Sequence, residues 1–340
     1  QTLAYAQENK NNLPLIQEIL AKARLQKGLT HREASVLLAC PSETVWEELY
    51  QLAEAIKLDY YGKRIVLFAP LYLSNYCVNS CVYCPYHAKN KHICRKKLTQ
   101  EEIKREVIAL QDMGHKRLAL EAGEDPLHNP IEYILESIDT VYHIQHKNGA
   151  IRRVNVNIAA TTVENYRKLH DAGIGTYILF QETYHKEQYE KLHPAGPKHN
   201  YDYHTEVMDR AMQGGIDDVG LGVLFGLQTY PYELAGLLMH AEHLEATYGV
   251  GPHTISVPRI KHADDIDPTA FDNSIDDETF AKMRGFADTE AEYEALRAVS
   301  HDLQVVYEDD DILIVNKPSG ILSQKAYDSD ISLNEQILSY

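Results

Sequence analysis

Short apolar segments alternate with amphipathic helical stretches from residue 63 to about residue 277, and this alternation restricts the fold more than any other feature of the 340-residue chain. Continuous apolar runs of this length are typical of strands buried on both faces, as in a parallel sheet. Repeated strand–helix units with right-handed crossovers close into a barrel or a partial barrel. The sequence therefore predicts an α/β fold with about six strands, at residues 65–74, 117–122, 152–160, 176–183, 218–226 and 254–260.

Residues outside this repeat divide the chain further. Residues 1–62 are predicted to form a helical N-terminal extension, because LPLIQEILAKARLQ has apolar residues at helical spacing and Thr30 with Glu33 forms a capping-box pattern. Residues 63–283 are the predicted barrel. Residues 284–340 are a separate C-terminal segment, with an acidic helix followed by two short β-like runs around an acidic turn.

Composition removes several classes of function. The formal net charge of −17 disfavours a nucleic-acid backbone as a partner. No apolar run is long enough for a membrane span, and the first residues lack a signal-peptide pattern, so we expect a cytoplasmic protein. Four of the five cysteines lie within CVNSCVYCPYHAKNKHIC, residues 77–94. An odd, clustered set of cysteines in such a chain indicates metal binding rather than a disulfide framework.

Cys77, Cys81 and Cys84 have Cys-x3-Cys-x2-Cys spacing directly after the first predicted strand. Thiolates are soft ligands of iron–sulfur clusters, and three of them leave one iron of a four-iron cluster open to a small molecule. Active sites of such barrels lie at the C-terminal ends of the strands. A zinc site is the alternative, with Cys94 or a histidine (His87 or His92) as the fourth ligand.

CVNSCVYC, with aromatic Tyr83 before the last cysteine, resembles the radical S-adenosylmethionine (SAM) signature. Four longer stretches resemble the tyrosine lyases of [FeFe]-hydrogenase maturation, the HydG family: APLYLSNYCVNSCVYCPYHAKNKHICRKKLTQEEI, ALEAGEDP, FQETYHKEQYEKLHPAGPKHNYDYH and VPRI. The resemblance covers about residues 1–283. The sister family is 2-iminoacetate synthase of thiamine biosynthesis, but the PYHAKN that follows Cys84 favours the hydrogenase branch.

This resemblance implies a radical SAM barrel of about six strands that holds a [4Fe-4S] cluster and SAM. In the family, the reduced cluster splits SAM to a 5′-deoxyadenosyl radical, and tyrosine is then cleaved at its Cα–Cβ bond to p-cresol and dehydroglycine. The expected partners are tyrosine, an electron donor such as a ferredoxin or flavodoxin, and the other hydrogenase maturases. The protein itself would supply orientation and a dry site.

The resemblance also assigns roles at two strand ends. Tyr83 belongs to the signature, and Ala122, Gly123 and Glu124 occupy the place of the family's Gly-Gly-Glu motif, which contacts the methionine amino group of SAM. Gln181 and Glu182, with Tyr184, end the fourth strand beside SAM and tyrosine and are predicted to be catalytic. The alternative for the Ala-Gly-Glu segment is an ordinary turn at the end of a strand.

Four further residues are candidates on weaker grounds. Asn155 and Asn157 alternate on the third strand, so both face one side, either toward SAM or as structural amides. Arg259 is predicted to grip the tyrosine carboxylate; an ion pair with a nearby aspartate is the alternative. His253 opens the same strand, at the opposite mouth of the barrel. By resemblance it is a candidate ligand of the labile iron of a second cluster, and otherwise an exposed histidine.

The C-terminal segment departs from the family. The family's C-terminal domain carries three cysteines for a second cluster that makes carbon monoxide and cyanide, whereas no cysteine follows Cys94 here, so we expect both products to be lost. LQVVYEDDDILIVNKPSGILSQ, residues 303–324, resembles instead the opening of RluA-type pseudouridine synthases without their catalytic aspartate motif. The expectation is a C-terminally truncated chain joined to a foreign segment, by gene fusion or as an assembly artefact. RNA modification by the tail and an inactive fusion fragment are the competing interpretations.

Overall fold

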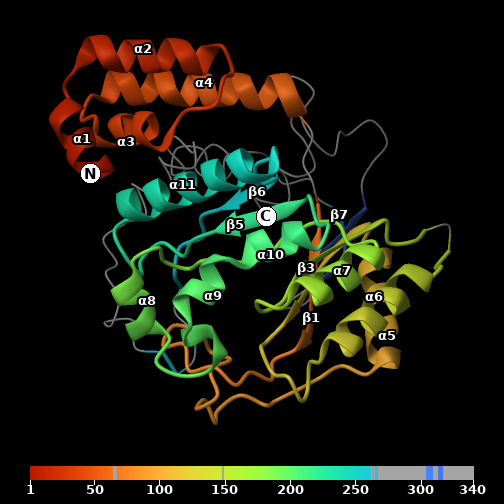
Figure 1. Ribbon diagram of the computed structural model, residues 1–340. Coiled ribbons are helices and arrows are strands. Elements are labelled where there is room, and N and C mark those ends of the chain that lie inside the picture. Colours follow the sequence, from red (N-terminus) through yellow and green to blue (C-terminus); the bar gives the residue numbers. More distant parts are fainter. Residues whose placement is uncertain are drawn as a thin grey trace. The chain divides into compact units, whose positions relative to one another are not determined.

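The computed structural model describes residues 1–63, 67–147, 149–261, 263, 265–266, 304–308 and 313–316. The chain divides into two compact units, Gln1–Ile275 and Asp276–Tyr340. The first unit contains the six-stranded sheet and all the described helices (Figure 1). The three-part division at residues 62 and 283 stays a prediction.

Six parallel strands form one sheet, in the order in which they occur in the chain, and this confirms the predicted α/β fold. Within the described residues no pairing joins the first strand to the sixth, so the described sheet is open. All C-terminal ends of parallel strands lie at one edge, where the chain leaves each strand for the next helix. The strands are β1 (Ala69–Ser74), β2 (Arg117–Ala122), β3 (Arg153–Asn157), β4 (Tyr177–Ile178), β5 (Val219–Gly222) and β6 (Thr254–Ser256).

The strands are shorter than the apolar runs that predicted them, and β4 is the extreme case. Regular pairing ends at Ile178, but the chain stays beside β5, because the Gln181 N–H donates to the Gly222 carbonyl at 2.8 Å. The ring of Phe180 lies so close to Gly222 that a Cβ there would come within 2.3 Å of it. The apolar run therefore predicts the length of the buried segment. The regular strand pairing ends earlier, near the C-terminal end of the strand.

Capping side chains begin two of the helices that follow β1. Thr99 and Glu102 form a complete capping box, and Thr162 accepts from the backbone N–H of Asn165. Gly114 and Gly173 follow these two helices with φ of 93° and 73°, a region that favours glycine. After β1 the helices are α5 (Gln100–Asp112), α6 (Ile131–His143), α7 (Val163–Asp171), α8 (Lys186–Leu192), a 3-10 turn η1 (Pro197–His199), α9 (Tyr201–Thr205), α10 (Val207–Gln213) and α11 (Tyr230–Tyr248).

Four helices precede the sheet and confirm that the N-terminal region is helical: α1 (Thr2–Asn9), α2 (Leu13–Arg24), α3 (His31–Ala39) and α4 (Glu43–Tyr61). They enclose a core of their own, which includes Ile16, Leu20 and Cys40. Cys40 therefore packs as a small apolar side chain in this core, which is not the environment of a metal ligand. His31 joins this layer to α11, because its Nδ1 lies 2.7 Å from a carboxylate oxygen of Glu242.

The second unit is described only at two strands, β7 (Gln304–Glu308) and β8 (Leu313–Asn316), which pair antiparallel. This pair confirms the two predicted β-like runs, whereas the acidic residues between them lie outside the described part. The rest of the predicted segment 284–340 lies outside the described residues. Among the described helices, none combines the length and the apolar character that a membrane crossing requires.

Candidate active site

The segment between β1 and α5 is a closed loop, residues 75–97, that we call the cysteine loop. It leaves β1 at Ser74 and returns beside it, where Ser74 and Lys97 form an antiparallel bridge. The Arg95 guanidinium holds its shape, donating to four loop carbonyls at distances of 2.6 to 3.3 Å: those of Asn75, Tyr86, His87 and Asn90. One side chain thereby fixes a loop that has almost no regular secondary structure.

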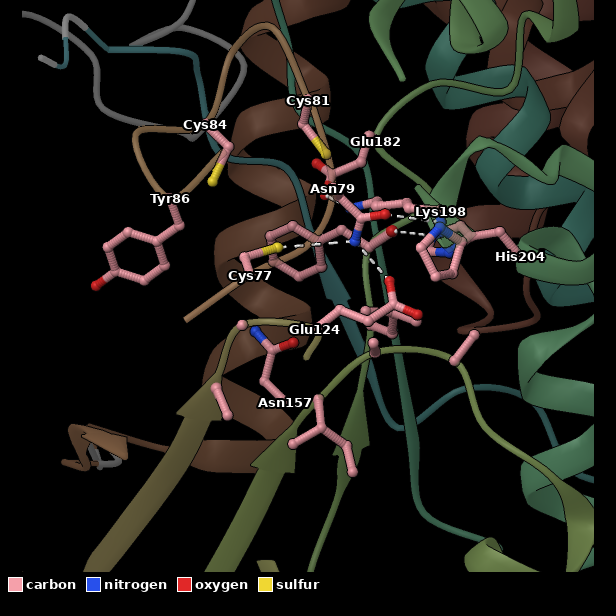
Figure 2. Close-up of a pocket in the computed structure, with 18 of the residues that line it drawn as sticks. Cys77, Asn79, Cys81, Cys84, Tyr86, Glu124, Asn157, Glu182, Lys198 and His204 are labelled. Atoms are coloured by element: carbon pink, nitrogen blue, oxygen red, sulfur yellow. Dashed lines mark hydrogen bonds and ion pairs between the residues drawn. The ribbon is translucent and has the colours of Figure 1, made fainter. Parts of the chain in front are cut away.

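The three predicted cluster cysteines line one pocket of about 310 Å³ at the C-terminal ends of β1 to β4. Figure 2 shows the sulfurs of Cys77, Cys81 and Cys84 turned toward a shared space above the strand ends. Cys81 is only 6% exposed, and burial raises the pKa of its thiol to about 12. Burial also raises the pKa of Cys84. Such thiols ionise when bound metal supplies the compensating positive charge.

The donor set fits an iron–sulfur cluster better than a zinc ion. Within the described part of the chain, no three His, Cys, Asp or Glu side chains converge closely enough to hold a single ion. Cys94 is exposed and does not line the pocket, and His87 lies 3.3 Å from Asp265 instead. Three soft thiols around a space larger than one ion suit a multi-iron cluster.

The turn after β2 packs directly against the cysteine loop. The Gly123 N–H donates to the Ser74 carbonyl at 3.0 Å, and the Val78 N–H donates to the Glu124 carbonyl at 2.8 Å. A Cβ on Gly123 would lie 2.4 Å from the carbonyl oxygen of Tyr76, so this position requires glycine. Ala122, Gly123 and Glu124 all line the pocket. Burial raises the pKa of the Glu124 carboxyl, while a hydrogen bond from Asn79 opposes the rise.

Asn79 connects three parts of the site and was missed by the sequence analysis. Its Nδ2 donates to a carboxylate oxygen of Glu124 at 2.6 Å and lies 3.7 Å from the Cys77 sulfur. Its Oδ1 accepts from the Lys198 N–H at 2.9 Å. Only 2% of Asn79 is exposed, and a Cβ on Gly196 would come within 2.3 Å of its Oδ1. Asn79 lies between Cys77 and Cys81, at a position that the cysteine spacing leaves unspecified.

An ion pair forms the wall opposite Glu124. The Lys198 ammonium lies 2.7 Å from a carboxylate oxygen of Glu182, with side chains 16% and 12% exposed (Figure 2). Burial lowers the pKa of Lys198, but the charge of Glu182 and other groups outweighs burial and raises it, so the ammonium stays charged. Glu182 has a φ of 68°, a strained conformation for a residue with a side chain. Glu182 was predicted from the sequence, and Lys198 was not.

Tyr83 forms part of the pocket wall through a buried contact with His193. The Tyr83 hydroxyl lies 2.7 Å from His193 Nε2, and His193 Nδ1 lies 2.7 Å from the Tyr189 carbonyl. Burial lowers the pKa of His193 to about 2, so its ring is neutral. Because a carbonyl only accepts, Nδ1 carries the proton and Nε2 accepts from the Tyr83 hydroxyl.

Of three further predicted residues, one lines the pocket and two do not. Asn157 lines the pocket, as expected for the last residue of β3. Asn155 shares its face but lies deeper, where its Oδ1 accepts from the Thr176 N–H at 3.0 Å, and it does not line the pocket. Gln181 is buried, with its Nε2 donating to Thr205 Oγ1 at 3.0 Å rather than reaching the pocket. The structure thus does not bring Asn155 and Gln181 to the thiols.

Two predicted residues on or near β6 also lie outside the pocket lining. Arg259 follows β6 and forms a parallel backbone bridge with Phe225. His253 precedes β6, is exposed, and donates its N–H to the Val219 carbonyl at 2.9 Å. This is the N-terminal end of the strand, opposite the pocket, as expected. The metal-binding role of His253 and the substrate role of Arg259 stay predictions, and Tyr184 lies outside this pocket too.

Glu233 of α11 holds the segment that follows β4, and its burial gives a prediction on pH. Its carboxylate accepts from the Thr183 hydroxyl and, at 2.9 Å, from the Tyr184 N–H. Burial raises its pKa from 4.5 to about 7. Because the folded state then binds the proton more tightly, stability is lost as pH rises from about 4.5 through 7.

We expect Glu233→Gln to flatten this dependence, since glutamine accepts from Tyr184 and donates to Thr183 without titrating. The free energy of unfolding of wild type should fall by on the order of 3 kcal/mol more than that of the variant between pH 5 and 8. Urea unfolding of the iron-free protein at several pH values measures this. Parallel pH curves for the two proteins would contradict the assignment.

Comparison with known proteins places this geometry in a family. A family model described as Radical SAM superfamily matches residues 71–236. A crystal structure of HydG, a maturase of the [FeFe]-hydrogenase, is 55% identical, with a TM-score of 0.80, covering 84% of this chain and 63% of that one. HydG from Carboxydothermus hydrogenoformans is 38% identical, with a TM-score of 0.74, covering 86% of this chain and 69% of that one.

A curated relative matches the same part of the chain. The 2-iminoacetate synthase of Escherichia coli strain K12 is 29% identical over 234 residues, which are 68% of this chain and 60% of that enzyme. The chain therefore spans less than two thirds of the length of this relative.

Proposed function

Because the chain belongs to the radical SAM superfamily, in the group that includes HydG and 2-iminoacetate synthase, we propose that it cleaves the Cα–Cβ bond of tyrosine to p-cresol and dehydroglycine. One observation carries the proposal: thiols with cluster spacing share a pocket with Gly123, Glu124 and the Glu182–Lys198 pair, in a chain 55% identical to a HydG structure. The hydrogenase-maturation branch is favoured because the two HydG structures compared above, at 55% and 38% identity, are more similar in sequence than the 2-iminoacetate synthase, at 29%.

Cys77, Cys81 and Cys84 would hold the [4Fe-4S] cluster, which together with SAM supplies the radical chemistry of the reaction. The chain's own residues bind and orient. Gly123 allows close approach of the backbone, and in this proposal the Glu124 carboxylate, which lines the pocket, accepts from the methionine ammonium of SAM. A bound cation would counter the effect of burial on the Glu124 pKa and keep the carboxylate ionised.

The wall formed by Glu182 and Lys198 presents both signs of charge toward the thiols, and this suits amino-acid ligands, which carry both signs themselves. Burial of the pair and of Tyr83 keeps water from this side of the pocket. In this proposal Arg259 binds the tyrosine carboxylate when the substrate is present, as a bidentate partner. An electron donor and the other hydrogenase maturases are the proposed partners.

Asn79→Ala is expected to weaken SAM binding by roughly 10- to 100-fold, because the amide both orients the Glu124 carboxylate and opposes the rise of its pKa, effects worth about 1–3 kcal/mol. Glu124 would lose the amide that now lies 2.6 Å from it. Equilibrium dialysis of labelled SAM against the reconstituted variant measures the change. The iron content of the variant shows whether the cluster site survives, and an unaltered dissociation constant in an iron-replete variant would count against this role.

Product analysis tests the proposed function. The protein is reconstituted anaerobically with iron and sulfide and incubated with tyrosine, SAM and dithionite. We expect p-cresol that depends on all three additions. Formation of 5′-deoxyadenosine without p-cresol would refute tyrosine cleavage, although it would leave the radical SAM assignment intact.

The same incubation addresses the competing interpretations. Both lyase branches give p-cresol, so this product does not distinguish them. Deoxy-haemoglobin added to the incubation traps carbon monoxide, and a carboxy-haemoglobin spectrum would overturn the expectation that this chain makes none. Labelled pseudouridine in RNA would support modification by the tail, of which most residues lie outside the described part. An inert fragment would yield none of these products.

A further inference from the structure

The cysteine loop carries a charge opposite to that of the rest of the chain. No Asp or Glu occurs between Asp59 and Glu101, although the chain has a formal net charge of −17. The second half of the loop, residues 87–97, is HAKNKHICRKK, and we call it the basic loop. Such a concentration of one sign in a chain of the other sign produces a local field that attracts anionic surfaces.

The cations of the basic loop are not equally available. Arg95 is engaged by the loop carbonyls, Lys97 lies over the Tyr133 ring at 3.9 Å, and Lys96 pairs with Glu102. Lys89 and Lys91 are exposed, and no carboxylate of the described residues forms an ion pair with either. His87 of the same loop lies 3.3 Å from a carboxylate oxygen of Asp265. Lys89 and Lys91 are therefore the positions where a partner's charge can be met.

The basic loop also lies beside the cluster thiols. The Ala88 N–H donates to the Asn79 carbonyl at 2.7 Å, which places Lys89 next to the first turn of the cysteine motif. Val78 and Val82, each adjacent to a cluster cysteine, are 39% and 37% exposed. Exposed apolar side chains flanked by lysines match the small apolar centre and charged rim of transient protein interfaces.

We propose that Val78, Val82 and the basic loop form the docking surface for an acidic one-electron carrier protein of the ferredoxin type. The inference rests on the proposed function, because the reaction requires an electron from outside the chain. One electron leaves the reduced ferredoxin, which is oxidised, and enters the cluster held by Cys77, Cys81 and Cys84, which is reduced by one electron. No bond is formed or broken at this step. Nucleic acid is a poorer occupant, since the remaining charge of the chain repels a long polyanion.

The test uses Lys89→Glu/Lys91→Glu and a control with the same change of charge, Lys27→Glu/Lys57→Glu, at exposed positions after α2 and on α4. An acidic two-cluster bacterial ferredoxin is the probe. Its association with the iron-free and with the reconstituted protein is measured by biolayer interferometry at low and high salt. We expect the first variant to weaken binding roughly 10-fold or more at low salt, with a smaller difference at high salt. The control variant should bind like wild type.

Cluster reduction separates this inference from the proposed function. Stopped-flow bleaching by reduced ferredoxin should slow in Lys89→Glu/Lys91→Glu, while reduction by dithionite should match wild type. The docking surface would be refuted if Lys89→Glu/Lys91→Glu bound ferredoxin and was reduced by it as fast as wild type. It would also be refuted if the control variant lost binding and reduction to the same extent. An RNA oligonucleotide serves as a second probe. If Lys89→Glu/Lys91→Glu lost binding to this RNA but kept binding to ferredoxin, the ferredoxin docking surface would be refuted. A wild-type protein that forms no p-cresol with dithionite would refute the proposed function instead and leave the binding result standing.

Discussion

Cys81→Ala is expected to abolish both the visible absorbance of the reconstituted cluster and the formation of p-cresol. Cys81 is the most buried of the three thiols that face the pocket, so no other side chain can replace its sulfur. A four-iron cluster that keeps one iron open for SAM has three protein thiolates, and loss of one removes the site rather than weakening it. Iron and sulfide content with the absorption spectrum measures the first effect, and chromatography measures the second.

Cys94→Ala is the matched control, because it removes a thiol from the same loop. Cys94 is exposed, and its sulfur faces the Arg95 carbonyl at 4.0 Å rather than the pocket. Iron content and p-cresol yield should stay at wild-type levels. If Cys94→Ala lost iron to the same extent as Cys81→Ala, four-cysteine ligation would replace the cluster assignment.

Lys198→Met should destabilise the protein by about 3–5 kcal/mol, because it leaves the Glu182 carboxylate buried without its counter-charge. Restoring neutrality with Lys198→Met/Glu182→Gln should recover most of this loss. Glutamine keeps the size of the side chain at a position with φ of 68°, so the backbone strain is the same in both proteins. Urea unfolding of the iron-free protein measures the free energy, without interference from cluster content.

Lys186 supplies the control for this pair. Its ammonium lies 2.8 Å from Asp202, but the side chains are 52% and 70% exposed, so water screens the interaction. Lys186→Met should leave the unfolding curve nearly unchanged. A loss for Lys198→Met no larger than that for Lys186→Met would show that Glu182 and Lys198 are not coupled as the structure places them.

Local patterns predicted the elements well. The capping box at Thr30 lies where the sequence predicts a helix start, and the six apolar runs each contain a strand. These features depend on residues within a few positions of one another. Every residue of a buried segment tends to be apolar, but regular strand pairing ends where the chain turns toward the pocket. The apolar runs therefore overestimate the lengths of the strands.

The site was harder to predict because it depends on contacts between distant segments. Strand alternation correctly placed Asn155 and Asn157 on one face, but it carries no information on depth, and only Asn157 reaches the pocket. Asn79 and Lys198 meet across 119 positions of the chain, and no local pattern records that contact. Lys198 lies in HPAGPKH, residues 193–199, a stretch rich in turn residues, and nothing in that stretch indicates that its side chain is buried against Glu182.

Tyrosine labelled with carbon-13 at Cβ reports which bond of the substrate breaks. The reconstituted protein is incubated with this substrate, SAM and dithionite, and the products are identified by mass spectrometry and carbon-13 NMR. Cleavage at Cα–Cβ predicts that the label appears in the methyl group of p-cresol, with an equal amount of an unlabelled two-carbon product. Labelled tyrosine recovered intact beside 5′-deoxyadenosine, or the label retained in a product that keeps the Cα–Cβ bond, would contradict the account.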